Sequence, residues 1–330
     1  MRHFYSLNEF SSEQIEEFLE RALHFKQNPY SDVLSQRQFA LMFLDPSLRT
    51  RCSFEVAIRQ LGAGVTTLEG QALWKIETLL GAKMDQDKSE HVREAIGVLS
   101  RYFDGLGLRA FARGKDREED LLDQMFSTFM ESAKIPVFNM ESAVYHPCQA
   151  MADLLTIKEL VKNFQGRKIT ISWAAHPRPL PMAVVNSILL ATTLVGMDVT
   201  LAHPEGFELQ EGMMTMAGDF SQKAGGGLRV VNDRKEAADD AEIVYAKAWG
   251  ALSRYEAPEE EAELRRKHSD WIVDTAFMDL TRRAYFMHCL PVRRNVVVTD
   301  KVIDSKQSVI FRQAENRLHA QKAILEWMYS

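Results

Sequence analysis

The chain has 330 residues, of which 46% are apolar and 26% are charged, and its formal net charge is −6. This length predicts about two domains, each with a well-packed core. The mild negative charge and the absence of a basic tract argue against a nucleic-acid partner, and the most apolar helix-like run, AVVNSILLATTLVGM, is too short and too polar to cross a membrane.

The cysteine content indicates a reducing compartment. The chain contains three cysteines, Cys52, Cys148 and Cys289, and no pair has the spacing of a metal site. An odd and sparse set of cysteines argues against a disulfide framework. The first residues, MRHFYSLNEF, lack the pattern of a signal peptide, so we expect a cytoplasmic protein.

The first half of the chain alternates between predicted helices and strands. The segment SSEQIEEFLERAL opens with a serine cap and places Ile15, Phe18 and Leu19 on one helical face. Short apolar runs predict strands, and intervening amphipathic runs predict helices. The strands are expected at 39–44, 65–68, 105–111 and 135–140. One helix is expected directly after the first strand, and two more are expected at 89–102 and at 117–133.

The alternation restarts after a long predicted helix at 145–164. Further strands are expected at 168–173, 198–203, 228–231, 241–246, 270–275 and 284–289, with helices from Met182 and from about Ala314. The charged run APEEEAELRRK predicts a solvated helix face. We therefore predict two doubly wound α/β domains with mainly parallel sheets and a boundary near residue 146.

Polar clusters follow several predicted strands, at the ends where open α/β sheets bind ligands. They are SLRTR after the first strand, Arg109, HPCQ from His146, HPRPLP from His176, Lys247, and HCLPVRR from His288. Hydroxyls and arginines at a helix N-terminus suit an anion such as phosphate. Each cluster also has a simpler explanation, since Ser47 and Thr50 could cap a helix and Cys289 could be a small core residue. The joint pattern favours a binding site.

Three of these motifs together resemble the transcarbamylases, the aspartate and ornithine carbamoyltransferase superfamily. They are S-x-R-T-R after the first strand, H-P-x-Q at the domain junction and H-C-L-P near the end of the chain. The resemblance implies a carbamoyl phosphate-binding domain at 1–146, completed by the C-terminal helix, and an amino-acid-binding domain at 147–330. It also implies a homotrimer with shared active sites, and a reaction that needs no metal or redox cofactor.

The resemblance assigns two overlapping groups of residues around carbamoyl phosphate. The binding group is Ser47, Leu48, Arg49, Thr50, Trp74, Arg109, His146, Gln149, Cys289, Leu290 and Arg317. The catalytic group is Arg49, Thr50, Arg109, His146 and Cys289. In the implied reaction a neutral amine attacks the carbamoyl carbon and phosphate leaves. Donors to the carbonyl oxygen stabilise the negative charge that grows there, and the phosphate can accept the proton.

Within the superfamily, the chain is most similar to the branch that acts on N-acylated ornithine. The SMG loop of the ornithine enzymes is absent, whereas WAAHPRPLP, YAKAWGA and ALWKIET are present. The resemblance places Trp74 in the site of a neighbouring subunit, Lys247 on the α-carboxylate and Glu141 on the amide N–H. The acylornithine group comprises Ser89, Glu141, His176, Arg178, Lys247, Leu290 and Arg293.

Three positions bear on the acyl group. The acetyl branch typically has a glutamate where this chain has Ser89, and lysines where it has Arg178 and Val297. A glutamate would repel a succinyl carboxylate, whereas serine leaves room and Arg178 matches a carboxylate well. N-succinyl-L-ornithine is therefore favoured over N-acetyl-L-ornithine, although Ser89 or Asp87 could simply cap a helix and the succinyl branch more often has proline at this position.

Two other classes of protein remain as alternatives. A non-catalytic homologue is possible because fold does not determine function. A dinucleotide-binding dehydrogenase is disfavoured because the glycine cluster AGGGL lacks the G-x-G-x-x-G spacing. The polar segment AKMDQDKSEH is a candidate lid over the substrate.

Overall fold

The computed structural model describes residues 1–70, 73–114 and 116–330, which form two compact units. Unit 1 contains Met1–Ser6, Phe18–Cys148 and Arg317–Ser330, and unit 2 contains Leu7–Glu17 and Gln149–Asn316. Both units have parallel α/β sheets, which confirms the predicted fold class. Among the described residues, no helix is long and apolar enough to span a bilayer.

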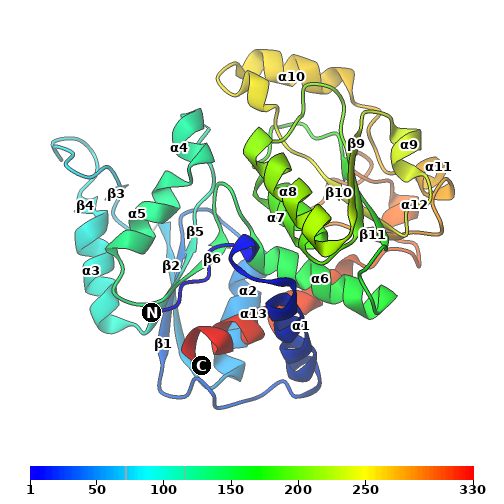
Figure 1. Cartoon of the computed structure of the whole chain (residues 1–330). Helices are drawn as coiled ribbons and strands as arrows, with labels where there is room; N and C mark the ends of the chain where they lie inside the picture. The colour runs from blue at the N-terminus through cyan, green and yellow to red at the C-terminus, as the bar shows by residue number, and fades with distance from the viewer. Residues whose placement is uncertain (71–72, 115) are drawn as a thin grey trace. The chain divides into compact units, whose positions relative to one another are not determined.

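Unit 1 is built on a four-stranded parallel sheet. Its order is β2 (Gly64–Glu69), β1 (Gln38–Phe43), β5 (Gly105–Arg109) and β6 (Val137–Glu141). One face of β1 packs Ala40 and Met42 with α3 (Val92–Tyr102) and α5 (Gln124–Ser132). The other face is covered by α2 (Leu48–Gln60) and α13 (Ile310–Tyr329), where Phe39 contacts Tyr329 and Phe54 contacts Phe138 (Figure 1).

Unit 2 is built on a five-stranded parallel sheet. Its order is β11 (Tyr285–Met287), β10 (Ile243–Lys247), β7 (Lys168–Trp173), β8 (Asp198–Ala202) and β9 (Gly227–Val231). Every residue of α7 (Ala183–Leu194) is buried, between the sheet and α8 (Glu211–Ala224). Helices α9 (Arg234–Ala238) and α11 (Thr275–Asp279) lie on the opposite face (Figure 1).

The other helices and strands have the following bounds. They are η1 (Leu7–Glu9), α1 (Ser12–Gln27), β3 (Ile76–Glu77), β4 (Glu90–His91), α4 (Arg117–Leu121), α6 (Pro147–Val161), η3 (Leu252–Arg254), α10 (Pro258–Lys267) and α12 (Asp300–Ile303). Strands β3 and β4 pair with each other as a small parallel ribbon.

Three predictions about elements were wrong. The segment 270–275 forms no strand, because only Val273 bridges to another segment. The helix expected at 117–133 is interrupted at Asp123, which has a left-handed backbone with φ 51°. The helix expected from residue 89 begins at Val92, because the preceding two residues form β4.

The predicted solvated helix face is confirmed in α10, where most of the charged residues are exposed. Glu261 and Arg265 of the same helix are buried and ion-paired.

Both sheets have a point at which the strand order reverses. In unit 1 it lies between β1 and β5, and in unit 2 between β7 and β10. Loops at such points diverge and leave room for a ligand at the carboxyl ends of the strands. In unit 1 the loops after β1 and β5 are tied together, since Leu44 N donates to Arg109 O at 3.0 Å and Phe111 N donates to the Asp45 carboxylate at 2.8 Å.

A fully buried lysine of α13, Lys322, bonds to other segments of unit 1, and its burial leads to a prediction about stability. Lys322 Nζ donates to Gln60 Oε1 at 2.8 Å and to the carbonyls of Pro29 at 3.0 Å and Phe25 at 3.4 Å. All three acceptors are uncharged. Burial lowers the pKa of Lys322 from its ordinary 10.5 to about 8.

The unfolded chain therefore binds a proton at Lys322 that the folded chain has lost, over the range from about pH 8 to about pH 10.5. The contribution of Lys322 should therefore make the protein's free energy of unfolding rise with pH across that window. We expect Lys322→Met to flatten the rise relative to the wild type, as measured by urea unfolding at pH 7.5, 9 and 10. Equal slopes in the two proteins would contradict the assignment.

Candidate active site

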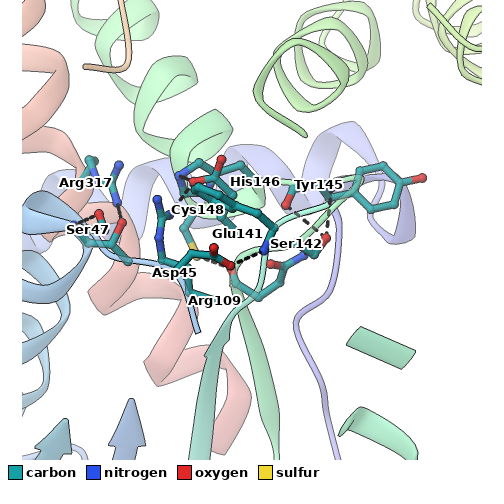
Figure 2. Close-up of polar contacts among 12 residues, drawn as sticks. Asp45, Ser47, Arg109, Glu141, Ser142, Tyr145, His146, Cys148 and Arg317 are labelled. Atoms are coloured by element: carbon teal, nitrogen blue, oxygen red, sulfur yellow. Dashed lines mark hydrogen bonds and ion pairs between the residues drawn. The ribbon is translucent and has the colours of Figure 1, made fainter. Parts of the chain in front are cut away.

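The segment Ser47–Thr50 forms the first turn of α2. Ser47 has an extended backbone and caps the helix, because its Oγ accepts from Thr50 N at 3.2 Å. Leu48 is exposed and Arg49 is half-buried. Thr50 is buried, and Arg317 Nη2 from α13 donates to its Oγ1 at 2.6 Å (Figure 2). The helix end thus combines backbone N–H groups with a buried arginine, as anion binding requires.

A buried carboxylate joins the next two predicted residues. Arg109 ends β5 and Glu141 ends β6, and the irregular register of these strands makes the two residues partners. Arg109 Nη1 donates to Glu141 Oε2, and His146 Nε2 lies 3.2 Å from the same oxygen (Figure 2). All three side chains are at least nine-tenths buried. Glu141, predicted only as an acylornithine ligand, therefore also orients Arg109 and His146.

The loop between Glu141 and His146 is held by a residue that sequence reasoning missed. The buried Asp123 carboxylate accepts from Ser142 Oγ, from Tyr5 OH at 2.9 Å and from Ala143 N at 3.3 Å. Desolvation raises the pKa of Asp123 despite these bonds. Asp123 differs from its neighbours in its left-handed backbone at the break between α4 and α5, and a backbone conformation cannot be recognised in the sequence.

Behind His146, Cys148 is an inert thiol. It is fully buried and its Sγ donates to Asn139 O at 3.3 Å. Burial raises the pKa of this thiol to about 12, so it stays protonated at neutral pH.

A hollow of about 740 Å³ in unit 1 lies beside the start of α2. Its walls include Ser47, Leu48, Trp74 and Lys88. The Trp74 side chain is 72% exposed, and the next residue after Lys88, Ser89, is also exposed. The other charged side chains of the hollow are Arg51, Glu69, Lys75 and Arg113, so positive charge predominates.

In unit 2, the loops after β7 and β11 bring positive side chains together. His176 Nε2 accepts from Arg293 Nε at 3.0 Å, and its Nδ1 lies 2.8 Å from Arg178 O. Burial lowers the pKa of His176, and the charges of Arg293, Lys247 and Arg265 lower it further. Arg178 N also donates to Nδ1 at 3.1 Å, so Nδ1 lies within hydrogen-bond distance of both the N–H and the carbonyl of Arg178, while Nε2 accepts from Arg293. Lys247 itself ends β10 and is 8% exposed.

The H-C-L-P segment makes a strained turn. Leu290 has φ 56°, in the left-handed region that is costly for a leucine, and precedes a cis proline. Leu290 N donates to His288 Nδ1 at 2.9 Å, while Cys289 is 9% exposed.

Two further predicted residues of unit 2 are buried. Gln149 lies in α6 and donates to Asp153, and Val297 is also buried. The predicted site residues from Ser47 to His146, together with Arg317, lie in unit 1. The predicted site residues from Gln149 to Arg293 lie in unit 2.

Two family models match this chain. The model described as aspartate/ornithine carbamoyltransferase, carbamoyl-P binding domain, matches residues 2–159, and the model of the Asp/Orn binding domain matches residues 180–328. N-acetylornithine carbamoyltransferase of Xanthomonas campestris pv. campestris is 41% identical, with 98% of this chain and 97% of the relative covered. N-succinylornithine carbamoyltransferase of Bacteroides thetaiotaomicron is 39% identical, with 87% and 86% covered.

Solved structures agree with these matches. Acetylornithine transcarbamylase complexed with acetylcitrulline has a TM-score of 0.97 and 40% identity, and each chain is covered to 99%. A glutamate-to-serine mutant of N-acetyl-L-ornithine transcarbamylase, complexed with carbamyl phosphate and N-succinyl-L-norvaline, has the same TM-score, 41% identity and 99% coverage of each chain.

Proposed function

The chain belongs to the aspartate/ornithine carbamoyltransferase family, in its N-acylornithine branch, and from this premise we propose its substrate. We propose that it transfers the carbamoyl group of carbamoyl phosphate to the side-chain amine of N-succinyl-L-ornithine. The products are N-succinyl-L-citrulline and phosphate, in arginine biosynthesis. Ser89 is the single observation that carries the choice of acyl group.

The start of α2 binds the phosphate in this proposal. Backbone N–H groups of the first helical turn and the positive end of its dipole face the anion, and Arg49 and Arg317 supply full positive charges. Arg317 is held by its bond to Thr50 Oγ1, so its guanidinium is preorganised. Preorganised donors stabilise a transition state without reorganisation at the moment of reaction.

Arg109, His146 and Thr50 act on the carbamoyl group. Their N–H and O–H groups donate to the carbonyl oxygen while the acceptor amine attacks the carbon. Glu141 Oε2 holds Arg109 and His146 in place. In this proposal the Glu141 carboxylate also accepts the amide N–H of the acylornithine. Positive charge in the site favours the neutral amine, and the departing phosphate takes its proton. Gln149, Cys289 and Leu290 complete the carbamoyl site.

The acceptor carboxylates are bound by the positive side chains of unit 2. Lys247 binds the α-carboxylate as a charge-assisted donor. His176 contacts both Arg178 and Arg293, and Leu290 precedes Arg293 by three residues in the H-C-L-P turn. Their combined charge suits a second carboxylate at the far end of the acyl group.

Ser89 favours the succinyl group. The most similar relatives include both acetyl- and succinylornithine enzymes at nearly equal identity, so overall similarity does not separate the two acceptors. Mutants of N-acetyl-L-ornithine transcarbamylase in which one glutamate is replaced by serine, alanine, proline or valine are found with N-succinyl-L-norvaline. We propose that Ser89 stands at the position of that glutamate, where a negative charge would repel the succinyl carboxylate.

The test of the proposed function is a comparison of three acceptors. Ornithine, N-acetyl-L-ornithine and N-succinyl-L-ornithine are incubated with carbamoyl phosphate, and citrulline-type product and phosphate are quantified. We expect turnover with N-succinyl-L-ornithine to dominate. Dominant turnover with N-acetyl-L-ornithine would be consistent with the proposed carbamoyl transfer and phosphate site. It would refute the inference of a succinyl group from Ser89, Arg178 and Val297.

Ser89→Glu should reverse the preference. A carboxylate near the acyl tail repels the succinyl group, so we expect the ratio of kcat/KM for succinyl over acetyl substrate to fall about tenfold or more. Ser89→Gln is the matched control, because it adds the same bulk without the charge. An equal fall in both variants would assign the effect to size, and an unchanged ratio would show that residue 89 does not contact the acyl tail.

Three further assignments accompany this proposal. Residues 1–146 with the C-terminal helix form the carbamoyl phosphate-binding domain, and 147–330 form the acylornithine-binding domain. The enzyme is a homotrimer in which Trp74 enters a neighbouring site, which is supported by its 72% exposure and by the exposed Leu48, Leu79 and Leu80. Static light scattering should give about three chain masses. The free cysteines suit the cytoplasm.

A further inference from the structure

Asp153 is a buried carboxylate that the mechanism above does not use. It lies on α6, one helical turn after Gln149, and its side chain is fully buried. Its Oδ1 accepts two amide hydrogen bonds, from Gln149 Nε2 at 2.8 Å and from Gln313 Nε2 at 2.7 Å. Burying a carboxylate is costly unless hydrogen bonds compensate it. The two amides that donate to Asp153 are therefore the place to look for its role.

The contact determines which way the Gln149 side chain points. A carboxamide has an N–H₂ donor on one side and a carbonyl acceptor on the other, and an oxygen that accepts hydrogen bonds can only be met by the donor side. Because Asp153 Oδ1 binds Nε2 of Gln149, the Gln149 carbonyl oxygen is directed away from Asp153. Without this acceptor, either orientation of the amide would be available.

The second amide extends the same control to the H-C-L-P turn. Gln313 donates to Asp153 through Nε2, so its Oε1 is left to accept from His288 N at 2.9 Å. His288 in turn accepts from Leu290 N, the residue with the left-handed backbone. One carboxylate oxygen thus sets the orientation of two amides, one of them Gln149 and the other a support of the strained turn.

We propose that Asp153 is a positioning residue that directs the Gln149 carbonyl oxygen toward the amino group of carbamoyl phosphate and, through Gln313, holds the turn at Cys289 and Leu290. This inference rests on the proposed placement of Gln149 in the carbamoyl site. The carbamoyl N–H₂ is the only hydrogen-bond donor of that group, so an acceptor facing it distinguishes carbamoyl phosphate from acyl phosphates that carry a methyl group instead.

The experiment compares three ligands that share a phosphate and differ in the group attached. The KM for carbamoyl phosphate is measured together with the inhibition constants of acetyl phosphate and inorganic phosphate, using whichever acylornithine is turned over. The discrimination factor is the ratio of the acetyl phosphate constant to the carbamoyl phosphate KM. We expect Asp153→Leu to lower this factor about tenfold while the constants for acetyl phosphate and inorganic phosphate stay unchanged.

Asp153→Asn is the conservative control. Its Oδ1 can still accept from both amides, so it should retain most of the discrimination. A purely structural role would instead weaken all three ligands together in Asp153→Leu, and that result would overturn the proposal. Should Asp153→Leu fail to fold, Asp153→Ser replaces it, because the shorter side chain no longer places a carboxylate oxygen between the two amides. The discrimination factor should then fall in Asp153→Ser but not in Asp153→Asn, and an unchanged factor in Asp153→Ser would overturn the proposal.

The outcomes separate this inference from the function it rests on. A wild-type enzyme that does not discriminate carbamoyl phosphate from acetyl phosphate would refute the placement of Gln149. Full discrimination in both the wild type and Asp153→Leu would leave that placement intact and refute the role of Asp153.

Discussion

Arg109→Met is expected to lower kcat by about 10²–10³-fold, the usual loss when one donor to a developing oxyanion is removed. Arg109 is buried at the end of β5 and is oriented by Glu141, so its guanidinium is preorganised. The measurement is steady-state carbamoyl transfer at saturating concentrations of both substrates. An undiminished kcat would show that Arg109 does not contact the carbonyl oxygen.

The same substitution should also destabilise the protein, which requires a control. Without Arg109, the Glu141 carboxylate stays buried beside His146, and removing one partner of a buried ion pair typically costs about 3–5 kcal/mol. The double variant Arg109→Met with Glu141→Gln removes the stranded charge. We expect it to recover most of the thermal stability without recovering kcat. The kcat of the Glu141→Gln single variant is measured alongside, because Glu141 also contacts His146, and only the further loss in the double variant is assigned to Arg109.

Lys247→Met is expected to raise the KM for the acylornithine about 100-fold while the KM for carbamoyl phosphate changes little. A buried, charge-assisted bond to the α-carboxylate contributes to ground-state and transition-state binding alike, so its loss appears mainly in KM. Lys247→Arg is the matched control, since it keeps the positive charge at the end of β10. It should retain more affinity than Lys247→Met.

The contrary result for Lys247 is equally specific. A rise in the carbamoyl phosphate KM, with an unchanged acylornithine KM, would move Lys247 to the phosphate side of the reaction. Equal losses in Lys247→Met and Lys247→Arg would show that geometry rather than charge governs the position.

Most of the fold followed from local sequence patterns. Continuous apolar runs mark strands that are buried on both faces, and this holds for β1, β6, β7 and β10. The segment 270–275 contains a shorter apolar run at its centre, Trp271, Ile272 and Val273, yet it packs as an irregular segment bridged only at Val273. The apolar residues there correctly indicate burial. Whether a buried segment pairs as a strand depends on the neighbouring strand, which local composition does not reveal.

The family, the parallel α/β architecture and the identity of the motifs were determined by the sequence alone, because each depends on residue types at short spacing. Only the tertiary structure decided which side chains meet. Asp153 and Gln313 are 160 residues apart, Thr50 and Arg317 are 267 apart, and Glu141 meets Arg109 across 32 residues. Such contacts arise where separate strands and helices converge, and a buried carboxylate such as Asp123 or Asp153 shows its role only when its donors are in place.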